Sequence, residues 1–450
     1  MFHARSNYRK TPPTPNLLAW INLLSVDACA NLQQLAKRYG DICKTPGRLG
    51  FYLLNEPNAI EHVLKTNYRN YMKLDLSYKG IGKVLGNNLL TNPNYDTWLH
   101  ERRLLQPHFH HQQLLQFTPR VTEITLAFCQ RWQRFADEEK AIDLLPEMSL
   151  LLFNILSACL FDGAFDHFDQ PFCHFINLGN RYVGSLAFLM PWFPLPLTVQ
   201  FKNTRRECFN IIQKAMDERR HSPKTTPDFI TTLLQASTEQ SGQLQTEQDI
   251  IDEILTFIVT GTETTATALA WLWYCLATNP DINANLQQEL QTILNGRIPV
   301  KDDLEKLSYT RMTFEETLRL YPPLWNITRR SVNEDIINDY YIPANKTIIL
   351  SPYVMQRHPQ YWNNPNEFNP ENFSEENKRK RISKYLYFPF GAGPRACIGN
   401  TFSLLEAQLI IPIIAQQFEF KLLAKQPIQL EPFITLRPKG GIWVKLKRKL

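Results

Sequence analysis

The sequence Phe390-Gly-Ala-Gly-Pro-Arg-Ala-Cys-Ile-Gly399 is the most informative stretch of the chain. It follows an aromatic run, Tyr385–Phe388, and precedes an apolar segment with helical spacing, Phe402–Ile414. A cysteine just before a helix has its thiolate stabilised by the helix dipole and by a nearby cation, here Arg395. No second Cys or His lies within twenty residues. A lone thiolate therefore suits a haem axial ligand better than zinc, which needs four ligands.

The same loop also fits a dinucleotide-binding pattern, G-x-G-x-x-A. Gly391, Gly393 and Ala396 would supply the turn, and Glu419 stands at the acidic position about 20 residues on. However, Pro394 removes a backbone N–H that a pyrophosphate would use. Only 31 residues follow Glu419, too few for the rest of a doubly wound sheet. We therefore keep this interpretation as an alternative and favour the thiolate.

Composition excludes several classes of protein. The 450 residues carry 49 Lys and Arg against 43 Asp and Glu, a net charge of +6 that is too mild to indicate a nucleic-acid partner. With 44% apolar residues the chain is predicted to be globular. Residues 1–16 are polar, without the apolar region of a secretory signal, and no uninterrupted apolar run of about 18 residues follows. These features predict a cytoplasmic protein whose eight cysteines are reduced.

Periodicity predicts a mainly α fold with small β-sheets. We expect one compact domain over residues 1–450, with 1–16 as a flexible N-terminal segment. The predicted helices are Asn58–Thr66, Leu114–Phe135, Met148–Leu160, Thr204–Arg220, Ile250–Thr278, Asn283–Leu294 and Ser308–Leu320. The strand-like runs are Lys44–Leu54, Tyr340–Ile349 and Phe433–Leu446, and Thr225–Asp249 is predicted to be a surface connection.

The helix over residues 246–278 is predicted to be long and buried, roughly 45 Å at 1.5 Å per residue. Thr246 and Asp249 have the spacing of a capping box. One stripe of this otherwise apolar helix is polar, with Thr256, Thr260, Thr264 and Thr267 beside Glu263. Each threonine can bond to the carbonyl four residues earlier, whereas a buried carboxylate needs a partner or a shifted pKa. Glu263 is therefore a candidate functional residue.

Together these motifs resemble the cytochrome P450 haem-thiolate monooxygenases, in their soluble bacterial-type form. The loop 390–399 matches the haem-ligand loop of that family in full, and three further matches lie in the expected order. Thr260-Gly-Thr-Glu-Thr-Thr265 is similar to the oxygen-activation segment, Glu316-Thr-Leu-Arg319 to the E-x-x-R helix, and Trp98 with Arg102 to the W-x-x-x-R contact with a haem propionate.

The resemblance implies a P450-like fold in which haem b lies between the long central helix and the cysteine loop. Cys397 would be the iron ligand, and Glu263 with Thr264 would deliver protons for O–O cleavage. The implied haem-binding residues are Trp98, Arg102, Thr260, Gly261, Arg329, Phe390, Gly391, Arg395, Cys397 and Gly399. Arg330 adjoins Arg329, and a slip of one residue between them stays open.

Two positions depart from the pattern of the family. Asn372 stands where many members have an arginine that joins the pair Glu316 and Arg319, and we expect its amide to bond both partners. Thr260 stands where a small residue usually faces the haem, so the shape of the substrate pocket is altered.

The resemblance also implies a substrate and partners. Thr260, Leu324, Ile327 and Ile434 would line the pocket, whose apolar walls predict a lipophilic substrate, a fatty acid or a similar molecule, hydroxylated with O₂. The apolar stretch Phe188–Leu197 is either a core loop or a patch in peripheral contact with a membrane.

Electrons would come from a separate ferredoxin or flavodoxin with its reductase, steered by Lys378–Arg381 and Lys384. The alternatives are a haem-thiolate isomerase or dehydratase and a haem-binding protein that does not turn over.

Overall fold

The computed structural model describes residues 10–24, 27–47, 50–183, 185, 188, 195–222, 228–238, 246–423 and 426–449. These residues form two compact units. The first comprises residues up to 80, 319–367 and 375–397, and the second comprises 81–318, 368–374 and 398 onward. The single domain over 1–450 stays a prediction. Residues 1–9 and most of the stretch 188–197 lie outside the described residues, so the flexible segment and the membrane patch stay predictions as well.

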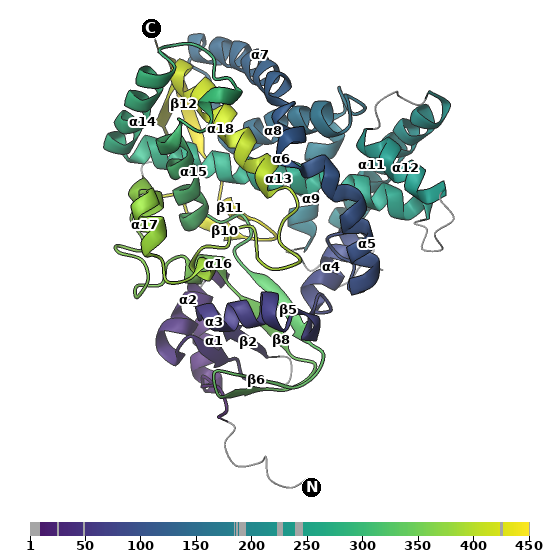
Figure 1. Ribbon diagram of the computed structural model, residues 1–450, viewed down its shortest axis with the longest axis vertical. Coiled ribbons are helices and arrows are strands. Elements are labelled where there is room, and N and C mark those ends of the chain that lie inside the picture. The colour runs from purple at the N-terminus through teal and green to yellow at the C-terminus, as the bar shows by residue number, and fades with distance from the viewer. Residues whose placement is uncertain are drawn as a thin grey trace. The chain divides into compact units, whose positions relative to one another are not determined.

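The first unit is built on a five-stranded sheet in the order β1-β2-β8-β5-β3 (Figure 1). Its strands are β1 (Ile42–Lys44), β2 (Phe51–Leu54), β3 (Tyr71–Met72), β5 (Ile327–Ser331) and β8 (Thr347–Leu350). The hairpin of β6 (Asp335–Ile337) and β7 (Tyr340–Ile342) is separate. Its helices are α1 (Leu17–Leu24), α2 (Ala28–Tyr39), α3 (Pro57–Glu61), α16 (Pro352–Met355) and α17 (Glu375–Lys380).

The second unit holds most of the helices. They are α5 (Tyr95–Leu105), α6 (His111–Leu115), α7 (Thr118–Asp137), α8 (Leu144–Leu160), α9 (Asp169–Val183), α11 (Pro196–His221), α12 (Phe229–Thr238), α13 (Glu247–Thr278), α14 (Pro280–Ile293) and α18 (Asn400–Gln417). The boundary between the units falls within α4 (Leu76–Leu85) and α15 (Ser308–Leu320).

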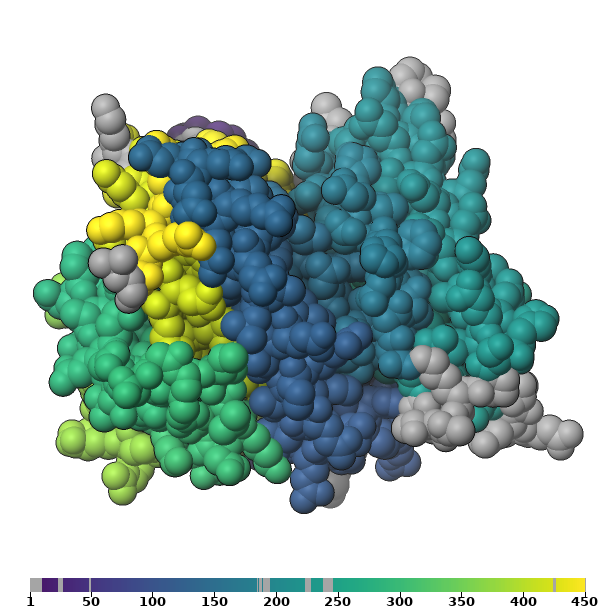
Figure 2. All heavy atoms as spheres, turned by 90° about the horizontal axis from the view of Figure 1, so that it is seen from above, coloured from purple at the N-terminus to yellow at the C-terminus, as the bar shows by residue number. Residues whose placement is uncertain are grey.

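Two small sheets complete the second unit. One has the order β4-β12-β9, from β4 (Ala141–Asp143), β9 (Phe418–Leu422) and β12 (Trp443–Arg448). The other is the hairpin of β10 (Leu430–Pro432) and β11 (Leu436–Pro438), which we call the C-terminal hairpin. Helix α7 packs against β12, and Figure 2 shows α7 in blue beside the yellow C-terminal strands. Among the described residues, no helix is both long and apolar enough to cross a bilayer.

Helix α13 is the centre of the second unit and packs along α8. The capping box predicted at its start is present, because Thr246 and Asp249 each accept a hydrogen bond from the backbone N–H of the other. The helix runs for 32 residues and is buried along most of its length. A Cβ at Gly261 would lie 2.9 Å from Leu156 Cδ1 on α8. The glycine therefore allows the two helices to approach closely.

The mainly α class with small sheets is confirmed, with differences at the boundaries. Each predicted strand run includes parts of two strands, so that Lys44–Leu54, for example, begins at the last residue of β1 and ends with β2, which pairs with β1 antiparallel. The predicted helix Leu114–Phe135 is divided into α6 and α7, and Pro119 lies at the first turn of α7, where its missing N–H costs nothing. The predicted surface connection contains helix α12.

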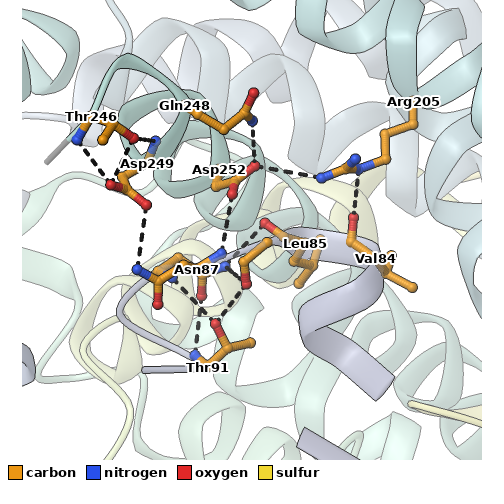
Figure 3. A network of polar contacts seen from close by, with 11 residues as sticks. Val84, Leu85, Asn87, Thr91, Arg205, Thr246, Gln248, Asp249 and Asp252 are labelled. Carbon is orange, nitrogen blue, oxygen red and sulfur yellow. Dashed lines mark hydrogen bonds and ion pairs between the residues drawn. The ribbon is translucent and has the colours of Figure 1, made fainter. Parts of the chain in front are cut away.

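A polar network fixes the loop that follows α4 to the first half of α13 (Figure 3). Asp252 accepts hydrogen bonds from Asn87 N at 3.1 Å and from Gln248 Nε2 at 2.9 Å. Arg205 of α11 lies 3.6 Å from Asp252 Oδ1 and donates to Val84 O at 3.1 Å. Asp252 of α13 thus binds both α11 and the loop after α4, and Arg205 of α11 also binds the end of α4.

The next residue of α13 makes a second contact to the same loop. Glu253 is fully buried, and its Oε2 accepts a hydrogen bond from Leu89 N at 2.8 Å. Its Oε1 has no hydrogen-bond partner among the described residues. Burial raises the pKa of Glu253 to about 8, and the neighbouring carboxylates of Glu101 and Asp252 add to the rise. Burial in the folded protein therefore favours the protonated form of Glu253.

Candidate active site

The cysteine loop is a tight turn held by its own backbone. Cys397 N donates to Phe390 O at 2.9 Å, and Gly391 N donates to Phe388 O at 2.9 Å. Gly391 and Gly393 have φ of +69° and +71°, which favours glycine. A Cβ at Gly393 would lie 1.8 Å from Leu64 O, so no side chain fits there. The motif spacing thus specifies one backbone shape that presents Cys397.

Cys397 differs from the other cysteines by its exposure. It is exposed, whereas the other seven are buried or half-buried. Burial raises the pKa of Cys129 and of Cys208 to about 12, so these thiols stay protonated and are poor metal ligands. Exposure of one thiol at the tip of a rigid loop fits an iron ligand.

Arg329 provides a test of whether a haem propionate fits the first unit. Its side chain is buried, with 5% of its surface exposed, on strand β5. Among the described residues its Nη1 donates only to neutral oxygens, Thr328 O at 2.8 Å and Tyr78 Oη at 3.4 Å. A buried guanidinium without a carboxylate is costly, so an anionic group would be stabilised beside it. Arg330 points to the opposite face of the strand and is half-buried, which favours Arg329 in the open choice between them.

The remaining predicted cofactor residues are placed in the two units as follows. Trp98 is buried on α5, and Arg102 is half-buried one turn later on the same face. Phe390 and Arg395 are half-buried in the cysteine loop, and Gly399 is the N-cap of α18. Their contacts to a haem stay predictions.

One stretch in the middle of α13 is less buried than the residues on either side of it. Thr260, Gly261 and Thr264 are half-buried within a helix whose other central residues are mostly buried. Thr260 Oγ1 donates to Thr256 O at 2.7 Å, and Thr264 Oγ1 donates to Thr260 O at 2.8 Å. Both hydroxyl protons are therefore used within the helix, while the lone pairs of each oxygen stay available to accept a hydrogen bond.

Glu263 is held by residues from the C-terminal hairpin. Its Oε1 accepts from Arg437 Nε at 2.6 Å and from Thr435 Oγ1 at 2.6 Å, and its Oε2 accepts from Arg437 Nη2 at 2.6 Å. Asn180 Nδ2 of α9 adds a contact of 3.4 Å. The side chains of Glu263 and Arg437 are 4% and 11% exposed. The buried carboxylate is thus ion-paired in a bidentate geometry.

Glu316 and Arg319 are both fully buried on α15. Glu316 Oε1 accepts from Asn369 N at 2.8 Å and from Asn372 Nδ2 at 3.1 Å. Arg319 donates to the carbonyl oxygens of Gln356, Pro365 and Glu367 at 2.8–2.9 Å. Asn372 therefore donates to Glu316 as expected, and backbone carbonyls of the first unit accept from Arg319.

Gln356 connects α15 to the segment before the cysteine loop. Its Nε2 donates to Arg319 O at 3.1 Å, and its Oε1 accepts from Phe388 N at 3.0 Å. The side chain is fully buried. Within the first unit, Gln356 thus joins Arg319 to the segment just before the cysteine loop.

The predicted pocket residues differ in their exposure. Leu324 is 38% exposed, Ile327 is 8% exposed, and Ile434 and Thr260 are half-buried. A Cβ at Gly391 would be 3.6 Å from Ile327 Cδ1, so Ile327 lies next to the cysteine loop. Their contact with a substrate stays a prediction.

Sequence reasoning missed Arg437, Thr435, Asn180 and Gln356. A signal was available for one of them, because Arg437 interrupts an apolar strand near the C-terminus and a charge in such a place needs a partner. Nothing in the sequence pairs it with Glu263, which lies 174 residues earlier.

Comparison with known proteins decides the family, since the cytochrome P450 family model matches residues 11–445. The chain belongs to the cytochrome P450 family. It is 30% identical over 424 residues to putative cytochrome P450 132 of Mycobacterium tuberculosis, covering 89% of this chain and 88% of that protein. It is 29% identical to cyclooctat-9-en-7-ol 5-monooxygenase of Streptomyces melanosporofaciens, covering 85% and 83% of the two chains.

The fold agrees with this assignment. The haem domain of cytochrome P450DA superposes with a TM-score of 0.87 at 22% identity, covering 99% of this chain and 98% of that one. This P450 is therefore an oxygenase that uses a haem-thiolate cofactor, and the dinucleotide alternative for Gly391–Ala396 is abandoned.

Proposed function

We propose that this P450 hydroxylates a lipophilic molecule, a fatty acid or a similar compound, with haem b held by Cys397 and electrons from a separate protein. The observation that carries the proposal is the single exposed thiol, Cys397, on a loop in which Gly393 leaves no room for a side chain. Arg329 supports it as a buried cation that suits a propionate. Trp98, Arg102 and Arg395 complete the proposed haem site. A cytoplasmic location with peripheral membrane contact stays a prediction.

The protein residues proposed for catalysis handle protons. When bound, a thiolate-ligated haem supplies the chemistry of O–O cleavage. Thr264 uses its own proton on Thr260 O, so its oxygen is fixed as an acceptor for a water. Glu263, the next residue, is the acid that can supply a proton through such a water. Thr264 thus provides a hydrogen-bond acceptor of fixed orientation, and Glu263 beside it provides the proton.

Replacing Thr264 with alanine is expected to uncouple electron use from product. Without the acceptor oxygen of Thr264, proton delivery from Glu263 loses its fixed path, and part of the O₂ consumed would be released as hydrogen peroxide in place of product. We expect product per electron pair to fall about tenfold or more, measured as product and peroxide against O₂ consumed. Thr278→Ala is the matched control, because Thr278 Oγ1 makes the same bond to the carbonyl of Tyr274 four residues earlier at 2.9 Å. Equal coupling in both variants would contradict the relay.

The substrate class is supported by the apolar side chains proposed for the pocket. Leu324, Ile327 and Ile434 offer no charge to a ligand, so binding would rest on the hydrophobic effect. The relative from Streptomyces is named for a cyclic alcohol, cyclooctat-9-en-7-ol. A spin-state titration with a long-chain fatty acid and with a cyclic terpene alcohol would distinguish a linear from a cyclic substrate.

An electron donor is proposed to dock at the basic segment Lys378–Arg381 with Lys384. Lys378 and Lys380 pair with Glu375 and Glu376 on the same helix, at 3.9 Å and 2.6 Å. Exposed Ile382 lies between the cations and Lys384, with 78% of its surface in solvent. A positive patch with an exposed apolar centre suits an acidic ferredoxin or flavodoxin.

Reversing the charges at this segment is expected to slow reduction by the partner. Arg379 and Lys384 are exposed, so Arg379→Glu with Lys384→Glu should leave the fold intact. We expect the rate of reduction by a ferredoxin to fall about tenfold at low salt, and the loss to shrink at high salt. Lys214→Glu on α11 is the control, and reduction by dithionite should not change in any variant. An unchanged rate with the protein donor would exclude this surface.

A further inference from the structure

Glu263 is held on both of its oxygens by the C-terminal hairpin. Two of the three bonds at 2.6 Å come from Arg437, the first of them to Oε1 and the second to Oε2. The third comes from Thr435, which is 2% exposed and whose hydroxyl donates to Oε1. Arg437 and Thr435 lie on or next to β11, which packs on α13. The acid of the catalytic pair is thus positioned by a segment far away in the sequence.

The ion pair with Arg437 restricts the position and the orientation of the Glu263 carboxylate. A bidentate guanidinium fixes the plane of a carboxylate as well as its position. Because the side chain of Glu263 is 4% exposed, water competes little for its oxygens. Arg437 Nη1 also donates to Asn177 Oδ1 at 2.8 Å, and Asn177 is exposed on α9. We call the contacts of Arg437 and Thr435 with Glu263 the Glu263 clamp. Through Arg437 and Asn177 the clamp extends from the buried carboxylate to the surface of the second unit.

We propose that Arg437 and Thr435 are positioning residues that hold Glu263 in place for proton delivery, and that protons enter at the edge formed by Arg437 and Asn177. This inference rests on the proposed function of Glu263 and Thr264. Each turnover consumes two protons with the two electrons from the donor protein. For each of these protons the carboxylate accepts one that enters from solvent at this edge and passes one on toward Thr264, so no charge accumulates. Arg437 itself gives up no proton, because a guanidinium stays protonated in proteins.

The chemistry of Thr435 fits this role. Its hydroxyl donates to the carboxylate when Glu263 is ionised, and it can turn to accept a hydrogen bond when Glu263 is protonated. Asn180 Nδ2, at 3.4 Å, keeps the position of the carboxylate in either state. The clamp therefore accommodates both forms of the acid without moving it.

The test compares three variants of the haem-loaded protein. Arg437→Met removes the charge and both bonds to Glu263, Arg437→Lys retains a charge, and Thr435→Val is nearly isosteric and removes one bond. For each we would measure product per electron pair, peroxide, the solvent deuterium isotope effect on turnover, and the substrate dissociation constant from the spin-state shift. The dissociation constant is needed because Ile434, a predicted pocket residue, adjoins Thr435.

We expect Arg437→Met to lower coupling about tenfold and to raise the isotope effect, with Arg437→Lys restoring most of the coupling. Thr435→Val should lower coupling about threefold, and the substrate dissociation constant should stay within threefold in all three. Normal coupling in Arg437→Met or Thr435→Val, with Thr264→Ala uncoupled, would overturn the clamp and leave the proposed function standing. If Arg437→Met fails to fold, Thr435→Val decides the question alone.

Discussion

Replacing Cys397 with serine is expected to remove the strongly red-shifted Soret band of the reduced, carbon monoxide-bound protein. That band reports a thiolate on the iron, and a serine hydroxyl is not ionised at neutral pH. Because the thiolate also drives O–O cleavage, we expect monooxygenation to fall at least about 1,000-fold. The measurement is the absorption spectrum, followed by product formation with a protein electron donor.

The matched control for this prediction is Cys173→Ser. Cys173 is a half-buried thiol of α9 whose pKa is raised to about 12, mainly by burial and further by Asp169. It should keep both the band and the activity. A red-shifted band that persists in Cys397→Ser would mean that another thiol holds the iron, whereas an ordinary band in both parent and variant would mean that the ligand is not a thiolate.

The parts of the fold that the sequence predicts well are set by residues close together in the chain. The start of α13 is defined by local chemistry alone, because the capping box at Thr246 can be seen in the sequence, and its C-cap Asn279 is followed directly by Pro280. The loop around Cys397 is predicted for the same reason, since the positive φ of Gly391 and of Gly393 is required within a few residues. Boundaries are missed where a turn interrupts an apolar run, as between β1 and β2, because both sides of the turn have the composition of a strand.

The parts of the site that could not be predicted depend on distant pairs. The sequence identifies Glu263 as a buried carboxylate but leaves its partner open, and the structure supplies Arg437. It also favours Arg329 but leaves a slip of one residue to Arg330 open, because the two are adjacent. Only the pairing of β5 with its neighbours decides which of them is buried. The partner of Glu263 and the burial of Arg329 are determined by tertiary packing, and no short stretch of the sequence indicates them.

Stability is expected to fall as pH rises from about 5 to 8, because of Glu253. Burial raises the pKa of this carboxyl from 4.5 to about 8 in the folded protein, so the folded chain binds a proton that the unfolded chain has released. In that window the native state holds more protons, and the free energy of unfolding decreases with pH. At about 1.4 kcal/mol per pKa unit, the total loss is on the order of 5 kcal/mol once the pH exceeds 8, and roughly 3–4 kcal/mol of it falls between pH 5 and pH 8.

Glu253→Gln should remove this part of the pH dependence. A glutamine can still accept from Leu89 N, and like the protonated acid it is neutral, so the loop after α4 should keep its contact. With about 2.1 cal/mol/K of unfolding entropy per residue, 1 kcal/mol corresponds to about 1 °C in a chain of this size. As the pH rises from 5 to 8, the Tm of the parent should therefore fall by about 3–5 °C more than the Tm of the variant. The measurement is thermal unfolding of both haem-loaded proteins at each pH.

The control for this experiment has the opposite sign. Glu247, on the first turn of the same helix, has its pKa lowered by hydrogen bonds from Gln213 and Arg220, so its ionised form favours the folded state. The Tm of Glu247→Gln should therefore not increase relative to the Tm of the parent as the pH rises. Parallel Tm curves for Glu253→Gln and the parent would show that Glu253 is ionised in the folded protein. Its unpartnered Oε1 would then need a cation or a water that the contacts of α13 and the loop after α4 do not supply.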